Sequence, residues 1–247
     1  MKHLHISALF LLVTVAGCSH RMPTATVELI DTSLSITPHA EKAALDAVKG
    51  QISHLGRGDA LILVPITGDA ENDTGGHILR LLAPATREPY DADLQRFREN
   101  AQKQFSVWVA TVRTEPNRTD ILGSLDAAQQ ELSTLPRGSI RRLIVVSDFI
   151  EDDGTYRFTS NRSLVSPTRA RVLATRLRAE HRFALHGVTL CLGRLESNDF
   201  APLSIARKNA IQAFWATYFT ENGQSPEIHF DGAGMLEDAG RECAAGK

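Results

Sequence analysis

The sequence predicts one α/β domain with a doubly wound, mostly parallel central sheet, helices on both faces and one antiparallel edge strand. Three observations lead to this prediction. The 247-residue chain is long enough for one good-sized domain. Continuous apolar runs, typical of buried parallel strands, alternate along the chain with helix-like stretches. This alternation favours a sheet covered by helices on both faces, and no internal repeat interrupts it.

The first half of the chain predicts three strands and one helix. Residues 27–30 form a short apolar strand that ends at Asp31. An amphipathic helix is expected over residues 38–54, because it opens on proline and its apolar residues recur at helical spacing. The uninterrupted apolar run 60–66 predicts a buried parallel strand. Residues 77–82 follow a polar loop and predict an antiparallel edge strand.

The same criteria apply to the second half of the chain, where longer helices alternate with strands. The expected elements are helices at about 91–112 and 119–135, a strand at 141–147, a helix at 167–182, a strand at 183–192, a helix at 201–219 and a final strand at 228–230.

The last of these helices carries an apolar and aromatic stripe at helical spacing. Such a stripe predicts packing against the core rather than contact with a cofactor. Its members are Ile205, Ile211, Phe214, Trp215, Tyr218 and Phe219.

The N-terminus predicts export and lipidation. The apolar run 8–13 is too short for a stable membrane span, which needs about 20 residues. Small residues followed by Cys18 resemble the bacterial lipobox, in which this thiol is acylated and becomes the mature N-terminus. We therefore expect a lipoprotein signal peptide at residues 1–17 and lipidation of Cys18. Ser19, in place of aspartate, favours by this resemblance the periplasmic face of the outer membrane. An ordinary secretory signal with a chance cysteine is the alternative.

The remaining chain divides into a linker at residues 18–25, the α/β domain at 26–231 and a Gly/Ala-rich tail at 232–247, which we expect to be flexible. Export places the protein in an oxidising compartment, where Cys191 and Cys243 are the thiols left. A disulfide between them is one possibility. The other is a free Cys191 buried as a small apolar residue in a strand-like run.

Charge and motif content exclude several classes of function. The net charge is −2 and the basic residues are scattered, so nothing predicts nucleic-acid binding. The sequence has no HExxH motif, no phosphate-binding loop and no Gly-x-Ser-x-Gly elbow. We therefore expect a protein that is not an enzyme.

Oxygen-bearing side chains follow the predicted strands at the edge where such sheets bind ligands. Asp31, Ser33 and Ser35 come directly after the first strand, and in an extended loop alternate residues point the same way. Thr119 enters a helix and Asp148 closes the strand 141–147. The set contains no cysteine or histidine and suits a hard cation, Mg²⁺ or Mn²⁺, with Ca²⁺ less favoured. An ion held this way keeps an exchangeable position, which a partner's carboxylate can take.

Asp31-x-Ser33-x-Ser35, a later threonine and Asp148 after a central strand resemble the metal-ion-dependent adhesion site of von Willebrand factor type A (VWA) domains. The resemblance covers residues 26–231 and implies the doubly wound fold. It also implies that the serines and the threonine bind the metal directly and that the aspartates bind it directly or through water. The implied function is a membrane-anchored module that recognises a protein partner through the metal.

The threonine is the one position of this set for which the sequence offers alternatives. Thr119 matches best, since the segment that follows it resembles the family's segment at a helix N-terminus. Thr111, Thr114 and Thr134 lie in the same region and remain alternatives.

Two other functions stay open. A Mg²⁺-dependent phosphohydrolase of the haloacid dehalogenase kind would use Asp31 as nucleophile, with Asp148 or residues 152–153 as the later carboxylate. Such enzymes usually need a second aspartate where this chain has Ser33. The third hypothesis is a structural envelope lipoprotein in which the metal site is vestigial.

Two acidic loops, at residues 69–73 and 151–154, could hold Ca²⁺. Neither has the spacing of an EF-hand loop, so we expect both to be solvated turns.

Overall fold

The computed structural model describes residues 21–68, 77–86, 91–112, 118–136, 138–221, 226–229 and 231–238. The predicted signal peptide 1–17, Cys18 and the acidic loop 69–73 lie outside these residues. In the described part of the chain, no helix is long and apolar enough to cross a membrane.

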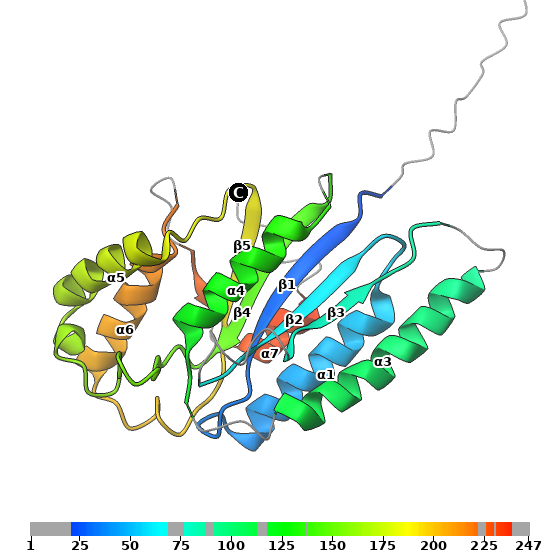
Figure 1. Cartoon of the computed structure of the whole chain (residues 1–247). Coiled ribbons are helices and arrows are strands. Elements are labelled where there is room, and N and C mark those ends of the chain that lie inside the picture. Colours follow the sequence, from blue (N-terminus) through cyan, green and yellow to red (C-terminus); the bar gives the residue numbers. More distant parts are fainter. Residues whose placement is uncertain are drawn as a thin grey trace, which may run out of the picture.

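A six-stranded sheet forms the centre of the domain (Figure 1), and it confirms the predicted fold class. The strands lie in the order β3-β2-β1-β4-β5-β6, with β3 antiparallel to β2 and every other neighbouring pair parallel. The strands are β1 (Thr24–Asp31), β2 (Ala60–Ile66), β3 (Leu79–Leu82), β4 (Ile140–Ser147), β5 (Val188–Arg194) and β6 (Ile228–His229).

Strand β1 lies in the middle of this sheet, between β2 and β4. Its last residues pair in parallel register, Asp31 with Ile66 of β2 and Ile30 with Val146 of β4. The carboxyl ends of the three strands therefore meet at one edge of the sheet, and the chain segments that follow them share this edge.

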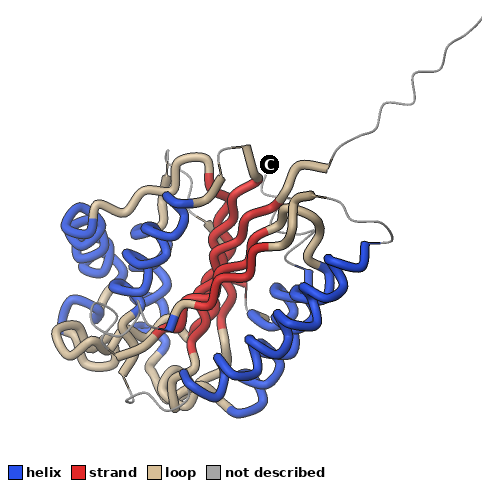
Figure 2. The backbone as a smooth tube through the Cα atoms, turned by 45° about the vertical axis from the view of Figure 1, so that its right-hand side comes forward, coloured by secondary structure: helices blue, strands red, loops and turns tan. Residues whose placement is uncertain are grey.

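Helices cover both faces of the sheet, as Figure 2 shows with the sheet between two helical layers. One core cluster joins the sheet to α4, α5 and α6, and a second joins it to α1, α3 and α7. Thr37 begins α1 as its N-cap, since its side chain accepts a hydrogen bond from the Ala40 N–H. The helices are α1 (Pro38–His54), α3 (Ala92–Val112), α4 (Ile121–Thr134), the short 3₁₀ helix η2 (Arg162–Val165), α5 (Pro167–His181), α6 (Ile205–Tyr218) and α7 (Gly232–Asp238).

Two predicted details of the second half are wrong. The strand expected from residue 183 begins only at Val188, because the chain first turns at Gly187, whose φ is +68°. Phe183 is buried all the same, as part of the loop that leads to this turn. Ile205 is 78% exposed, because it lies in the first turn of α6, before the part of the helix that packs on the core.

The expectation of a flexible tail from residue 232 is also wrong for its first part, which forms α7. Met235 and Leu236 are buried in the cluster that contains α1. The Gln51 side chain donates a hydrogen bond to the Leu236 carbonyl, 3.1 Å away. These two apolar side chains anchor a short helix in a segment whose composition is otherwise rich in glycine and alanine.

Cys191 is buried in β5 and takes part in a disulfide bond, so a free thiol at this position is excluded. Cys243 lies outside the described residues.

Candidate metal centre

The loop after β1 gathers the first three predicted side chains on one side. The Asp31 carboxylate is fully buried, and its Oδ1 accepts a hydrogen bond from the Ser33 N–H at 3.0 Å. The hydroxyls of Ser33 and Ser35 share a hydrogen bond, with 2.9 Å between their oxygen atoms. The Ile36 N–H donates to the Ser33 carbonyl at 3.1 Å and closes a turn. Alternate residues of this loop therefore present oxygen atoms to one region, as their spacing predicts.

The loop after β4 brings Asp148 to the same place. Its Oδ2 accepts a hydrogen bond from the Ser35 hydroxyl at 3.2 Å, and its Oδ1 accepts one from the Ile150 N–H at 2.8 Å. Four of the five predicted residues are thus connected through their side chains or the Ser33 backbone. They come from two segments that lie more than a hundred residues apart in the sequence.

Burial dominates the electrostatics of this group. Burial first, and then the charge of the neighbouring Asp31, raise the pKa of Asp148 to about 7. Hydrogen bonds from Ser197, the Ile150 N–H and Ser35 oppose this rise only in part. Burial raises the pKa of Asp31 as well, against hydrogen bonds from Ser147 and Ser33. Two buried carboxylates with hydroxyl neighbours form a donor set that fits a hard dication, whose charge would offset theirs.

Thr119 reaches this edge of the sheet through its backbone. Its N–H donates to the Asp152 carbonyl at 3.2 Å, and the Asp152 N–H donates back at 2.8 Å. This bridge joins the start of α4 to the loop that follows Asp148. The Thr119 side chain is buried beside that loop.

The alternative threonines are less well placed. Thr111 is exposed on α3, and its hydroxyl donates to the Val107 carbonyl of its own helix. Thr134 is the last residue of α4, at the other end of the helix from Thr119. Thr114 lies outside the described residues.

Two further serines, neither of them among the five predicted ligands, support this group. The Ser147 hydroxyl donates to Asp31 Oδ2 at 2.6 Å and accepts from the Phe149 N–H at 3.0 Å. Ser197, in the loop after β5, is buried and hydrogen-bonds the Asp148 side chain. The one sequence signal for both is their place at or just beyond the carboxyl end of a predicted strand.

The backbone directly after Asp148 is strained. Phe149 has a φ of +62°, the left-handed region that non-glycine residues rarely adopt. Its ring packs against Trp215 of α6, with ring centroids 5.9 Å apart, and the Trp215 indole N–H donates to the Phe149 carbonyl at 2.8 Å. Helix α6 therefore holds the conformation of the loop that carries Asp148.

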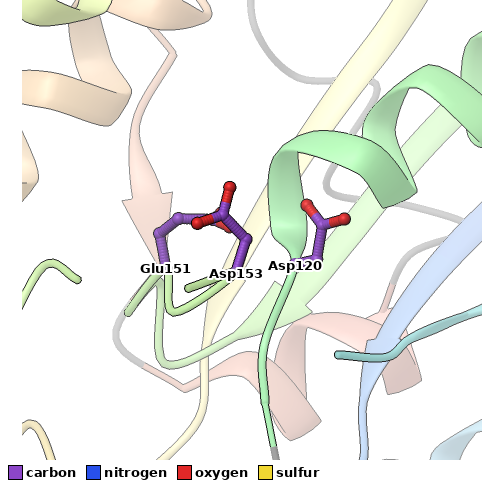
Figure 3. A group of neighbouring side chains, drawn as sticks. All are labelled: Asp120, Glu151 and Asp153. Atoms are coloured by element: carbon purple, nitrogen blue, oxygen red, sulfur yellow. The ribbon is translucent and has the colours of Figure 1, made fainter. Parts of the chain in front are cut away.

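The acidic loop 151–154 is not a solvated turn throughout, which corrects the prediction. Glu151 is fully buried. One carboxyl oxygen each from Asp120, Glu151 and Asp153 lies within 4.8 Å of the other two. Figure 3 shows the three side chains together between the start of α4 and the loop after β4.

No family model matches the sequence, and a search among curated proteins finds no match. Solved structures do resemble the chain. The pilus adhesin SpaC from Lactobacillus rhamnosus GG has a TM-score of 0.51 at 11% identity, over 91% of this chain and 31% of that one. A von Willebrand factor type A structure from Catenulispora acidiphila has a TM-score of 0.46 at 20% identity, over 91% of this chain and 42% of that one. The manganese-loaded TRAP protein of Plasmodium vivax has a TM-score of 0.41 at 16% identity, over 78% of this chain and 62% of that one.

The chain therefore spans less than two thirds of each of these three proteins. At such identities a likeness bears on fold alone. The strand order, the antiparallel edge strand β3 and the two helical layers give the described part of this chain a doubly wound α/β fold, and this fold is what the chain shares with SpaC.

Proposed function

We propose that this protein is a VWA-like, membrane-anchored module that binds a divalent cation and recognises a protein partner through it. The ion would be Mg²⁺, with Mn²⁺ or Ca²⁺ as alternatives, held by five residues. These are Asp31, Ser33, Ser35, Thr119 and Asp148. The hydrogen-bonded group of two buried aspartates and two serines at the carboxyl edge of the sheet is the observation that carries the proposal.

A cation explains why two carboxylates are buried together here. Removing Asp31 and Asp148 from water is unfavourable, and each disfavours the charge of the other. One dication would balance both charges, and the serine hydroxyls would supply further oxygen ligands. An ion of this kind keeps positions for exchangeable ligands, so a carboxylate from a partner protein can bind there.

The surroundings of the site suit a protein partner. Leu34, between the two serines, is 74% exposed at the same loop. An apolar side chain beside an open cation position would give a partner both an apolar contact and a charged one.

The proposed lipid anchor would orient this site. Cys18 precedes Thr24, the first residue of β1, by only a short segment. Strand β1 then runs from the amino edge of the sheet to Asp31 at the opposite edge (Figure 1). An acylated Cys18 would therefore hold the amino edge near the outer membrane and present the metal edge to the periplasm.

A non-enzymatic role agrees with the contacts of the group. Ser33, at the position where a phosphohydrolase would need a second aspartate, hydrogen-bonds Ser35. Asp152, a candidate later carboxylate for that reaction, pairs instead with Arg157, 3.4 Å away.

Calorimetric titration of the purified full chain with Mg²⁺ and Mn²⁺ tests the metal proposal. Asp31→Asn should remove one class of binding site, because it deletes a charge the ion needs. Asp46→Asn, an exposed aspartate on α1, is the matched control and should bind as the unmodified chain does. Unchanged binding by a well-folded Asp31→Asn protein would refute the proposed site.

The partner proposal needs a separate measurement. Envelope extracts passed over the immobilised chain should release a bound protein on addition of chelator, and Asp31→Asn should retain none of it. Capture that is equal with and without chelator would contradict metal-dependent recognition, even if the metal itself binds.

A further inference from the structure

The acidic cluster formed by Asp120, Glu151 and Asp153 lies beside the candidate metal centre but shares no residue with it. Asp120 follows Thr119 directly, and Glu151 comes three residues after Asp148. The cluster therefore joins the start of α4 to the loop after β4.

Backbone N–H groups hold each of the three carboxyl groups in place. Asp120 is the N-cap of α4, and its Oδ1 accepts from the Gly123 N–H at 2.7 Å. Asp153 Oδ1 accepts from the N–H groups of Thr155 and Tyr156, both at 2.6 Å. The cluster is thus built by local structure on both segments.

Glu151 is the most constrained of the three. Its Oε2 accepts hydrogen bonds from the N–H groups of Ile121 and Leu122, at 3.0 and 3.1 Å. Its Oε1 is buried, and among the described residues none donates a hydrogen bond to it. Burial raises the pKa of Glu151 well above its ordinary value, and the charges of Asp120 and Asp153 add to that effect.

An unpartnered, buried carboxyl oxygen beside two further carboxylates is unfavourable in the protein alone. The unfavourable free energy is largest if all three carboxyl groups are charged. A bound cation would supply the missing partner of Oε1 and would balance the charge of the cluster. This buried oxygen, more than the number of acidic residues, indicates a ligand.

The distances between the carboxyl oxygen atoms of the cluster can be compared with the distance that two ligands of one ion can span. Two ligands of one Ca²⁺ ion, each about 2.3–2.6 Å from it, can lie up to roughly 5 Å apart. Ligands of Mg²⁺, at about 2.0–2.1 Å, can lie only about 4 Å apart. The oxygen atoms of the cluster all lie within 4.8 Å of one another, which is within the span of one Ca²⁺ ion.

The positively charged side chain of Arg118 lies close to the cluster and would compete with a metal ion for it. A side chain added at Gly154 would come within 2.9 Å of an Arg118 guanidinium nitrogen, so this group lies against the acidic loop. Arg118 is exposed and can move aside when an ion binds.

We propose that Asp120, Glu151 and Asp153 form a second cation site that takes Ca²⁺. The ion would bind the loop after β4 to the first turn of α4. This site does not depend on the proposed function of the first one, since no residue is common to both.

Calcium titration of the full chain in excess Mg²⁺ tests the second site, with terbium luminescence as an independent probe of the same site. Asp153→Asn keeps an acceptor for the Thr155 and Tyr156 N–H groups but loses the charge, and should weaken Ca²⁺ binding at least tenfold. Asp152→Asn removes the same charge from the neighbouring residue and should change the affinity less than twofold. Glu151→Gln should also weaken binding, with circular dichroism to verify its fold.

Asp31→Asn separates this proposal from the first one. It should leave the calcium and terbium signals intact, because Asp31 belongs to the other site. Loss of both signals in Asp31→Asn, with unchanged binding in Asp153→Asn, would assign all binding to the first site and overturn the second. Absence of any Ca²⁺ binding in excess Mg²⁺ would overturn it as well.

Discussion

Strand β1 carries two fully buried carboxyl groups, Glu28 and Asp31, in very different surroundings. Asp31 ends the strand, accepts hydrogen bonds from Ser147 and Ser33, and lies with Asp148. Glu28 lies mid-strand between Leu63 of β2 and Ile144 of β4, and neither of its oxygens has a hydrogen-bond partner among the described residues. Gln51 lies near enough to lower its pKa slightly, without the geometry of a hydrogen bond.

The difference shows that burial alone does not mark a functional carboxylate. Burial raises the pKa of Glu28 to about 8, so near neutral pH this group is mostly an uncharged carboxylic acid. Asp31 has donors aimed at both of its oxygens and a second carboxylate nearby. Donors that favour the charged form, together with a neighbouring carboxylate, distinguish a candidate ion site from a buried acid.

The largest effect is expected from removing the titration of Glu28. Its folded-state pKa of about 8 lies above its ordinary value of 4.5, so folding retains a proton that the unfolded chain releases. The stability that this retained proton gives the folded protein is fully present below pH 4.5, and it is lost as the pH rises to about 8. The loss amounts to about 1.4 kcal/mol per pH unit, on the order of 5 kcal/mol in all. Glu28→Gln cannot titrate, so relative to the unmodified chain it should gain about this much stability across that range.

Urea unfolding of both proteins between pH 4.5 and 8.5 measures this gain. Glu196→Gln, on the surface, is the matched control and should leave the pH dependence of stability unchanged. A difference between Glu28→Gln and the unmodified chain that stays constant with pH would show that Glu28 is already ionised in the folded protein.

The second way to test the comparison is to make Asp31 more like Glu28. Ser147→Ala removes the donor to Asp31 Oδ2 and the acceptor of the Phe149 N–H, and leaves buried polar atoms unpaired. We expect a loss of about 1–3 kcal/mol in the free energy of unfolding of the metal-free protein. Urea unfolding at pH 7 measures it. Ser147→Thr retains the hydroxyl and should lose less, whereas equal losses in the two variants would mean that the hydrogen bonds contribute little.

The fold class and the grouping of four candidate site residues could be predicted from the sequence because both follow from short-range patterns, whereas the strand order is known only from the structure. Continuous apolar runs marked β2 and β4, and the alternation of side chains in an extended loop placed Asp31, Ser33 and Ser35 together. Because the carboxyl ends of parallel strands meet at one edge of a sheet, Asp148 was expected in the same region.

The missed features depend on contacts between distant segments. Ser197 hydrogen-bonds Asp148 from a loop whose place beyond a predicted strand is its one sequence signal, and Glu151 is buried where α4 begins against it. In α7, two apolar residues that pack on α1 outweigh a composition typical of a flexible tail. Sequence patterns report the local preference of a segment but not the surface against which it packs.

The smallest expected effect concerns the backbone conformation, which differs between the surroundings of Glu28 and those of Asp31 and Asp148. Around Glu28 strand β1 is regular, whereas Phe149 directly after Asp148 has a φ of +62°. Phe149→Ala loses the packing on Trp215 and keeps the strain, while Phe149→Gly loses the same packing and relieves the strain. Phe149→Gly should therefore be the more stable of the two by about 1 kcal/mol.

The control pair is Val145→Ala and Val145→Gly, in the regular part of β4. There glycine should be the less stable of the two by roughly 0.5–1 kcal/mol, because it loses more conformational freedom on folding. The quantity to measure is the difference in the free energy of unfolding between the glycine and the alanine variant, which should have opposite signs at positions 145 and 149. Both variants of a pair lose the same side-chain packing, so that loss cancels in the difference. If glycine is the weaker residue at both positions, the left-handed conformation costs nothing, and the Trp215 contact alone fixes the loop that carries Asp148.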